Sequence, residues 1–389
     1  MRFHTDDVYY LRSEPGAAAL RAVAEFPLTD STRVADTAAA RARFGERARV
    51  LVETTLLRRR AAAKELPSNW LFTDEALQQA TAAPVARHRA ARLAVRAQPV
   101  HDATCSIGTE LAALRDAGIR VVGSDIDAVR LAMARHNLGP AAWLCRADAL
   151  RPVTRDAVVV VDPARRTGGR RRFSPDDYQP GLGPLLDSYR GRDLVVKCAP
   201  GIDFDYLTRL GFDGEIELTS YHGSVREACL WSAGLAGPRV RRRASVLDTG
   251  EQITDTEPDD CAVRPVGRWI VDPDGAVVRA GLVRHYGARH GLWQLDPDIA
   301  YLSGDRLPEG LRGFEVLDQL AFDERRLRQA LSALDCGALE ILVRGVQVDP
   351  DALRRRLRLR GGRALSAVIT RLGSGPASHA TVFVCSPSR

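Results

Sequence analysis

The pattern of apolar and polar residues changes character twice along the chain, near residue 98 and near residue 237. Within residues 1–98, apolar side chains recur at helical spacing in stretches that are rich in Ala and Arg. Prolines stand where these stretches would begin or end. The pattern predicts a helical domain over 1–98, with helices in the stretches 16–25, 36–64 and 74–97.

Residues 99–236 instead alternate short β-branched runs with amphipathic runs. The first five β-branched runs are far enough apart for parallel strands joined by helices or loops, whereas the last two are close enough for an antiparallel pair at an edge. The run at 158–161 is apolar at every position, as in a strand that is covered on both faces. The predicted strands are 99–103, 120–124, 142–146, 157–161, 194–198, 215–220 and 228–232.

The remaining residues predict two further parts. Residues 237–322 are rich in Gly, Pro and Asp and predict a β-rich connecting region with strand-like pieces at 245–247 and 269–271. Residues 323–389 predict a small α+β domain. Its elements are helices at 323–334 and 350–359 and strands at 340–343, 364–371 and 380–385.

Composition places the chain among globular proteins. It has 389 residues, of which 45% are hydrophobic and 27% charged, so a wholly disordered chain is excluded and two or three domains are expected. The sequence has no run of about 18 apolar residues, so no membrane-spanning helix is expected. Seven cysteines without a CxxC pair fit neither a disulfide framework nor a zinc site, and the eight histidines show no ligand spacing. We therefore expect a cytoplasmic protein without metal.

Charge is unevenly distributed along the chain. The net charge is +7, and all but two of the 56 basic residues are Arg. This Arg excess is typical of a GC-rich genome and weakens any conclusion from total charge. The asymmetry is more informative, because 1–98 and 331–389 are each +5 while 99–236 is −1. Basic flanks around a neutral centre favour an anionic macromolecular partner.

Acidic residues follow the first three predicted strands of the centre. Asp102 precedes a tight turn of small residues that leads into a helix. Asp125 stands 17 residues beyond Gly108, where an acid is placed to accept both hydroxyls of a ribose. Asp148 is placed to accept from an adenine amine, with the N–H of Ala149 beside it. The candidate cofactor-binding residues are Asp102, Thr104, Ser106, Gly108, Asp125, Ile126, Asp148 and Ala149.

The fourth and fifth predicted strands end in candidate catalytic residues, which are Asp162, Pro163, Arg165 and Lys197. Cys198 is expected to be a buried thiol, because Lys-Cys-Ala-Pro is not the setting of a pyrimidine-attacking nucleophile. Glu227 is expected either to form a salt bridge or to line the pocket. Two basic runs are candidate RNA-binding segments, although each is also compatible with a solvated surface. Their candidate residues are Arg165, Arg166, Arg170, Arg171, Arg354, Arg355 and Arg358.

The order of these motifs, from Asp102 to Asp162-Pro163, resembles the motif series of class I S-adenosylmethionine-dependent methyltransferases. Over nearly its full length the chain also resembles bacterial methyltransferases with a C-terminal THUMP-like domain. The segments that carry this resemblance are DPARRTGGRRR at 162–172, VKCAPGI at 196–202, VREACLW at 225–231, LDPDIAYLSGD at 295–305 and LEILVRGVQV at 339–348.

The resemblance implies an α/β fold class, with a Rossmann-like seven-stranded methyltransferase domain at 99–236, a helical domain before it and a THUMP-like α+β domain at 323–389. It implies S-adenosyl-L-methionine as cofactor. Many members have Gly at the position of Ser106. Similar amino-methyltransferases have an aromatic residue at the position of Arg165.

Because THUMP domains are associated with RNA-modifying enzymes, the expected function is methylation of an rRNA or tRNA base. A methyltransferase for a small molecule or protein is one alternative, and a non-catalytic RNA-binding module with a vestigial pocket is another. The identity of the acceptor and the oligomeric state do not follow from the sequence.

Overall fold

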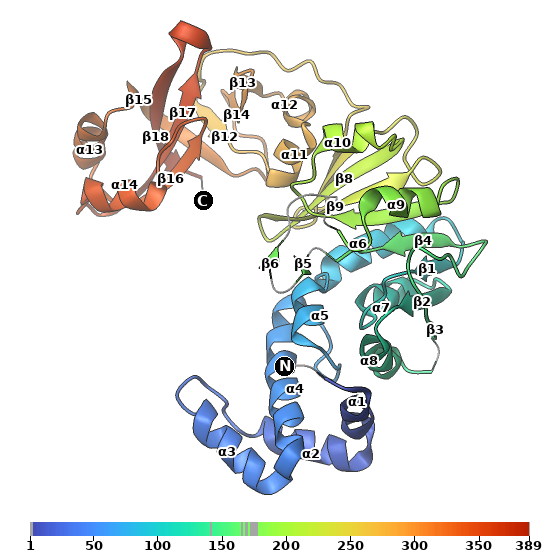
Figure 1. The fold of residues 1–389 in the computed structure, drawn as a ribbon. Helices are drawn as coiled ribbons and strands as arrows, with labels where there is room; N and C mark the ends of the chain where they lie inside the picture. The colour runs from blue at the N-terminus through green and yellow to red at the C-terminus, as the bar shows by residue number, and fades with distance from the viewer. Residues whose placement is uncertain (1–2, 141, 165, 168–169, 172–177, 389) are drawn as a thin grey trace. The chain divides into compact units, whose positions relative to one another are not determined.

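The computed structural model describes residues 3–140, 142–164, 166–167, 170–171 and 178–388. The chain divides into two compact units, whose elements are labelled in Figure 1. The first unit comprises Met1–His222, Arg226–Pro238 and Leu247–Thr249. The second comprises Gly223–Val225, Arg239–Val246 and Gly250–Arg389.

Helices fill the N-terminal part of the first unit, as the sequence predicts, but the predicted helices 36–64 and 74–97 are each interrupted. Local side chains set their starts: Ser13 accepts from the N–H of Gly16, and Thr73 accepts from the N–H of Ala76. The helices are α1 (Thr5–Arg12), α2 (Glu14–Ala24), α3 (Arg33–Phe44), α4 (Ala48–Ala61), α5 (Asp74–Gln79) and α6 (Ala83–Ala94), with 3-10 turns η1 (Gly45–Arg47) and η2 (Ala62–Lys64). The apolar core that α1 to α5 share extends to Ile107 and Met133, so these helices pack against the part of the unit that follows.

The central sheet of the first unit contains all seven predicted strands. They are β1 (Val100–Asp102), β2 (Val121–Asp125), β3 (Trp143–Arg146), β4 (Val158–Val161), β7 (Leu194–Cys198), β8 (Gly214–Tyr221) and β9 (Ser224–Ser232). They lie in the order β8-β9-β7-β4-β1-β2-β3. The pairs from β7 to β3 are parallel, and β9 is antiparallel to β7. This arrangement confirms the predicted Rossmann-like fold.

Helices cover this sheet. They are α7 (Thr109–Asp116), α8 (Ala128–Leu138), α9 (Leu182–Ser188) and α10 (Phe204–Arg209). All four positions of β4 are buried, as its unbroken apolar run predicts. Leu93 of α6 and Leu114 of α7 share a core with Val160 and Trp231, so α6 and α7 pack on one face of the sheet. The last N-terminal helix is therefore part of the cover of the central sheet.

The strand β3 ends the sheet and exposes most of its side chains. Trp143 is 75% exposed there. Cys145 on the same strand is an exposed thiol, whereas the other six cysteines are buried, and all seven are free. A small ladder between β5 (Arg166–Thr167) and β6 (Arg170–Arg171) lies outside this sheet.

The second unit contains a hairpin of β10 (Arg242–Val246) and β11 (Glu251–Thr254), and a sheet with the order β13-β14-β12-β15-β18-β17-β16. In that sheet β16 and β17 are parallel, and the other five pairs of neighbouring strands are antiparallel. Its strands are β12 (Trp269–Val271), β13 (Trp293–Asp296), β14 (Ile299–Gly304), β15 (Gly313–Ala321), β16 (Cys336–Arg344), β17 (Arg363–Leu372) and β18 (His379–Pro387).

Four helices accompany these strands: α11 (Gly275–Ala280), α12 (Val283–His290), α13 (Glu324–Ala333) and α14 (Pro350–Leu357). The sequence predicts α13, α14 and the last strands of the sheet. It does not predict the helices α11 and α12 or the strands β11, β13, β14 and β15. Within the described residues, no helix is long and apolar enough to cross a bilayer.

Candidate functional site

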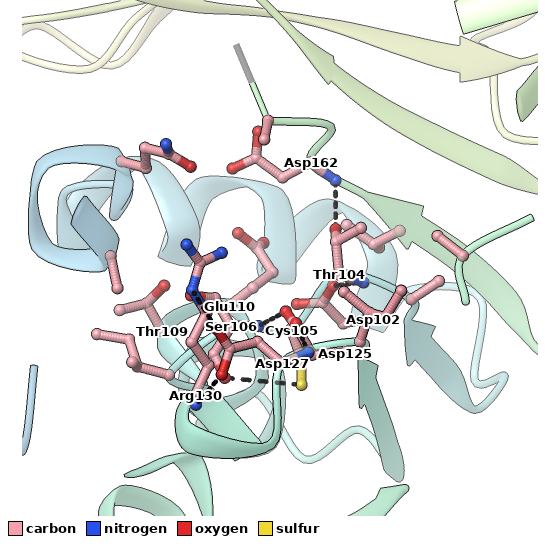
Figure 2. A pocket seen from close by; sticks show the side chains of 18 of the residues that line it. Asp102, Thr104, Cys105, Ser106, Thr109, Glu110, Asp125, Asp127, Arg130 and Asp162 are labelled. Atoms are coloured by element: carbon pink, nitrogen blue, oxygen red, sulfur yellow. Dashed lines mark hydrogen bonds and ion pairs between the residues drawn. The ribbon is translucent and has the colours of Figure 1, made fainter. Parts of the chain in front are cut away.

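A cavity of about 460 Å³ lies where β1, β2, β4 and β7 end (Figure 2). Ligands of open α/β sheets bind at the carboxyl ends of the strands. All but one of the predicted cofactor residues line this cavity, and they are Asp102, Thr104, Ser106, Asp125, Ile126, Asp148 and Ala149. Two of the predicted catalytic residues, Asp162 and Lys197, line it as well.

The turn after β1 is bonded to the end of β2. The backbone N–H of Ser106 donates to Oδ2 of Asp125 at 2.9 Å, and the N–H of Cys105 donates to the carbonyl of Ser124 at 2.9 Å. Ser106 adopts a φ of 49°, in the left-handed region that costs an L-residue about 1–2 kcal/mol. The position therefore requires the backbone conformation that favours glycine, and Ser occupies it at a cost.

Gly108 does not line the cavity. It precedes α7 with a φ of 90°, and a Cβ there would lie 2.8 Å from Cδ1 of Leu138. Its role in this structure is thus to allow the turn and the close packing of α8.

Two acids at the end of β2 have different roles. Asp125 is buried and also accepts from the N–H of Asp127 at 2.8 Å, and burial raises the pKa of its carboxyl. Asp127, two residues further along the chain, also lines the cavity, but it caps α8 by accepting from the N–H groups of Val129 and Arg130. The capping role leaves Asp125 as the acid of β2 that is held inside the cavity wall.

The residues that are predicted to bind adenine, Asp148 and Ala149, lie after β3. Asp148 is exposed and accepts from the N–H of Leu150 at 2.9 Å. The hydroxyl of Tyr189 donates to the carbonyl of Ala149 at 2.8 Å, which fixes this segment. Ile126 is 64% exposed although it is apolar, and it lines the same cavity.

Asp102 carries an unusual carboxyl. It is 3% exposed, and burial together with the nearby carboxylate of Glu110 raises its pKa to about 8. Its Oδ1 accepts from the N–H of Thr104 at 3.0 Å. At neutral pH the carboxyl of Asp102 is therefore mostly protonated.

Asp162 and Lys197 form an ion pair at the rim of the cavity. Nζ of Lys197 lies 2.6 Å from Oδ2 of Asp162 and 2.6 Å from Oγ1 of Thr81. Burial alone would lower the pKa of Lys197, but the carboxylates of Asp162 and Glu110 outweigh it and raise that pKa. The N–H of Asp162 donates to Oγ1 of Thr104 at 2.6 Å, which holds the residue beside the turn after β1.

A buried ionic network lies behind this pair. Arg89 of α6 is 1% exposed and donates to both carboxylate oxygens of Glu110, at 2.7 and 2.9 Å, and to Glu227 of β9. Oε2 of Glu110 lies 3.7 Å from Nζ of Lys197, so the network reaches the cavity. Both expectations for Glu227 are met, because it forms this salt bridge and also lines a second cavity beside the first.

The sequence did not predict Arg89 or Glu110, nor the part of α5 that lines the cavity. Arg89 could have been found, because it stands among Ala86, Ala90 and Leu93 on the apolar face of its helix, where a charge needs a buried partner. The α5 residues carry no such signal. They are Glu75, Ala76 and Gln79, followed by Ala80.

The remaining candidates from the sequence near the ends of the fourth and fifth strands are not among the described residues that line this cavity. Cys198 is buried, as expected for a structural thiol. Pro163 is buried and does not line the cavity. Arg165 lies outside the described residues. For Arg166, Arg170 and Arg171 the structure describes the β5–β6 backbone and not the side chains.

The basic residues of α14 divide into two groups. Arg354 donates to Asp351 at 2.6 Å and to the carbonyl of Leu339 at 2.9 Å, so it is engaged within the unit. Arg355 and Arg358 line an open depression of about 470 Å³ on the second unit. Arg328 and Arg356 complete its basic lining, although Arg356 is paired with Glu324.

Comparisons with known proteins agree with this geometry. A family described as THUMP domain-like matches residues 311–387, which span β15 to β18. The chain is 78% identical over 359 residues to uncharacterised S-adenosylmethionine-dependent methyltransferases of Mycobacterium tuberculosis strains H37Rv and CDC 1551, covering 90% of this chain and 100% of each relative.

Among solved structures, the chain resembles a proposed methyltransferase from Porphyromonas gingivalis W83. The TM-score is 0.72 and the identity 17%, and the match covers 100% of both chains. At this identity the likeness shows that the fold is shared.

Proposed function

Because this chain belongs to the S-adenosylmethionine-dependent methyltransferases, we propose that it methylates RNA, on a base of rRNA or tRNA. The observation that carries the proposal is the THUMP-like match at 311–387, within the unit that bears an open arginine-lined depression. Arg328, Arg355 and Arg358 are charged donors that suit phosphate groups. Contacts of this kind position a nucleic acid without reading its sequence.

The cavity at the ends of β1, β2 and β4 suits the cofactor. S-adenosylmethionine carries a net positive charge, and Asp102, Asp125, Asp148 and Asp162 all line the cavity. We assign Asp125 to the ribose hydroxyls and Asp148 with Ala149 to the adenine. Thr104, Ser106 and Ile126 contribute the remaining walls, and Gly108 contributes by shaping the turn.

When bound, S-adenosylmethionine supplies a methyl group that the lone pair of an acceptor atom attacks. Such a displacement depends mainly on positioning. Lys197 holds Oδ2 of Asp162, and within the described residues Oδ1 of Asp162 accepts no hydrogen bond. We assign that oxygen to orienting the acceptor, with Pro163 and Arg165 shaping the loop beside it.

We assign four parts to the chain: a helical part at 1–98, a methyltransferase part at 99–236, a connecting part at 237–322 and a THUMP-like part at 323–389. RNA contacts are assigned to the 323–389 part, through Arg354, Arg355 and Arg358, and to the loop that carries Arg165, Arg166, Arg170 and Arg171. Arg354 contributes least, because its guanidinium already bonds to Asp351.

The test uses the full chain, labelled S-adenosylmethionine and total RNA from a strain that lacks the gene. We expect the label to enter RNA, and Asp162→Ala to lose at least a hundredfold in turnover while the Kd for S-adenosylmethionine changes by less than threefold. Asp187→Ala, at an exposed position of α9, is the matched control and should retain full activity. Label that enters a small molecule or a protein, and not RNA, would contradict the proposal.

A further inference from the structure

A second cavity, of about 300 Å³, adjoins the cofactor cavity. Gln79, Ala80, Asp162 and Lys197 line both cavities, so these residues form the wall between them. Its other walls come from η2, the end of α5 and the start of α6, and from the ends of β7 and β8 and the start of β9. The N-terminal helical part and the central sheet therefore build this cavity together.

The two lysines that line the second cavity are already bonded. Nζ of Lys197 donates to Asp162 and Thr81. Nζ of Lys64, in η2, donates to the backbone carbonyls of residues 77, 78 and 80 at the end of α5. These two lysines fix the walls of the second cavity and have little capacity left for a ligand.

Two polar groups on the shared wall remain available. Oδ1 of Asp162 accepts no hydrogen bond among the described residues, and its side chain is 25% exposed. Nε2 of Gln79 is buried and has no hydrogen-bond partner in the part of the chain that the structure describes. A buried donor left unpaired costs about 1–3 kcal/mol, so a ligand that accepts from Gln79 recovers that cost.

We propose that this second cavity binds a nucleobase that presents an exocyclic amine beside an unprotonated ring nitrogen on its Watson–Crick edge. Asp162 accepts from the amine and Gln79 donates to the ring nitrogen. Adenine and cytosine share this edge, whereas uracil and hypoxanthine present a carbonyl oxygen beside a protonated nitrogen. The inference rests on the proposed function, because it assigns the acceptor of the same methyl transfer.

The size and the mouth of the cavity fit one nucleotide. Its volume is at the lower end of the roughly 300–1,000 Å³ of small-molecule sites, so a base drawn out of an RNA strand fits better than a folded segment. Arg226 lines the cavity from an exposed position, and its Nε donates to the carbonyl of Tyr221. The rest of its guanidinium is placed to take a phosphate oxygen.

The transfer of the methyl group to the amine needs no further reactant. The amine nitrogen forms a bond to the methyl carbon as the carbon–sulfur bond breaks, and the electron pair of that bond stays on sulfur. The amine then gives one proton to water. Asp162 orients the amine through its free oxygen, while Gln79 selects the base.

The first experiment measures binding of single nucleotides to the full chain with S-adenosylhomocysteine present. AMP and IMP differ at the proposed edge, as do CMP and UMP. We expect at least one of AMP and CMP to bind tenfold more tightly than its partner nucleotide. Equal affinities within both pairs, or no binding of any nucleotide, would overturn the assignment.

A variant of Gln79 then tests whether this residue donates to the base. Gln79→Met keeps the size of the side chain and removes its donor, so it should weaken binding of the preferred nucleotide at least tenfold. Gln319→Met makes the same change at an exposed position of β15 in the second unit and should leave binding unchanged. If Gln79→Met binds the nucleotide as the unmodified chain does, Gln79 does not read the base.

A second readout separates this inference from the proposed function. The position of the methyl group is mapped by mass spectrometry of the RNA nucleosides. A methyl group on the exocyclic amine of adenosine or cytidine supports both proposals. Methyl groups on uridine, guanosine or ribose leave RNA methylation standing and overturn the base assignment. Selective AMP or CMP binding without any methylation of RNA overturns RNA methylation and leaves the pocket assignment standing.

Discussion

Single carboxyl groups decide how the cofactor cavity responds to pH. Asp102 and Asp125 are both buried beneath it, and burial raises the pKa of both. Asp125 accepts two backbone N–H groups, which favour its charged form, whereas Asp102 accepts one and lies near Glu110. The charged form of Asp102 therefore has fewer hydrogen bonds to stabilise it, and its pKa is raised to about 8.

This difference predicts a pH-dependent cofactor affinity. Below pH 8 Asp102 holds a proton in the free protein, and a positively charged cofactor favours the ionised form, so binding must release that proton. We expect the affinity for S-adenosylmethionine to rise at least threefold between pH 6.5 and pH 8, and then to level off. Calorimetry in buffers of different ionisation enthalpy measures both the affinity and the released proton.

The control is Asp102→Asn, which cannot ionise and should show a flat profile over the same range. The stability of the fold depends on pH in the opposite direction to the cofactor affinity. The unfolded carboxyl loses its proton near pH 4 and the folded one near pH 8, so the free energy of unfolding falls as pH rises between these values. A cofactor affinity of the unmodified chain that does not change with pH would show that Asp102 does not contact the bound charge.

At the scale of elements, α6 couples the N-terminal helical part to the central sheet. Its Arg89 bonds to Glu110 on α7 and to Glu227 on β9, and all three side chains are buried. Burial of a charge in this way is tolerated only when partners satisfy it. The helix thus links α7 to β9, and Glu110 extends this network to Lys197.

We expect Arg89→Met to destabilise the first unit by about 3–5 kcal/mol, because two buried carboxylates lose their partner. Arg87→Met on the same helix removes an exposed pair with Glu65 and should cost about 0–1 kcal/mol. Hydrogen exchange of residues 83–94 in the full chain measures both effects. If the two variants exchange alike, the buried network does not stabilise α6.

The elements also show where sequence patterns suffice. The strands β4 and β7 are buried at every position and consist mainly of Val, because both faces of the sheet are covered there, so they could be predicted. The strand β15 was missed, because its exposed positions at 317–319 break the apolar run. The short helices α11 and α12 are followed directly by Gly281 and Gly291, and in a glycine-rich stretch such helices look like turns.

The residues of the site, too, could be predicted only where a local sequence pattern marks them. Asp125 and Asp162 could be predicted because each ends a recognisable strand. Gln79 and Thr81 could not, because the fold alone brings them to Asp162, about 80 residues further along the chain. Long-range packing of a helix on a sheet leaves no local pattern to read.

At the scale of the whole molecule, the two units carry different parts of the proposed function. The cofactor cavity and the second cavity belong to the first unit, and the arginine-lined depression belongs to the second. Deleting 331–389 would remove β16, β17 and β18 from a seven-stranded sheet, so it would disrupt the second unit. Substitutions therefore test RNA binding better than truncation does.

We expect the triple change of Arg328, Arg355 and Arg358 to Gln to weaken RNA binding at least tenfold. The slope of log affinity against log salt should fall by about 2, because three phosphate contacts are lost. The matched control changes the exposed Arg21, Arg43 and Arg49, which removes the same charge from the first unit. An equal loss in the control would mean that net charge, and not this depression, governs binding.

The distribution of thiols has a practical consequence. Six of the seven cysteines are buried, and Cys145 alone is exposed, on a strand whose neighbour ends in Asp125. A maleimide dye should therefore attach to the folded, unmodified chain at one position, adding one dye mass to the intact protein. That dye would report cofactor binding by fluorescence, without any cysteine having to be introduced or removed.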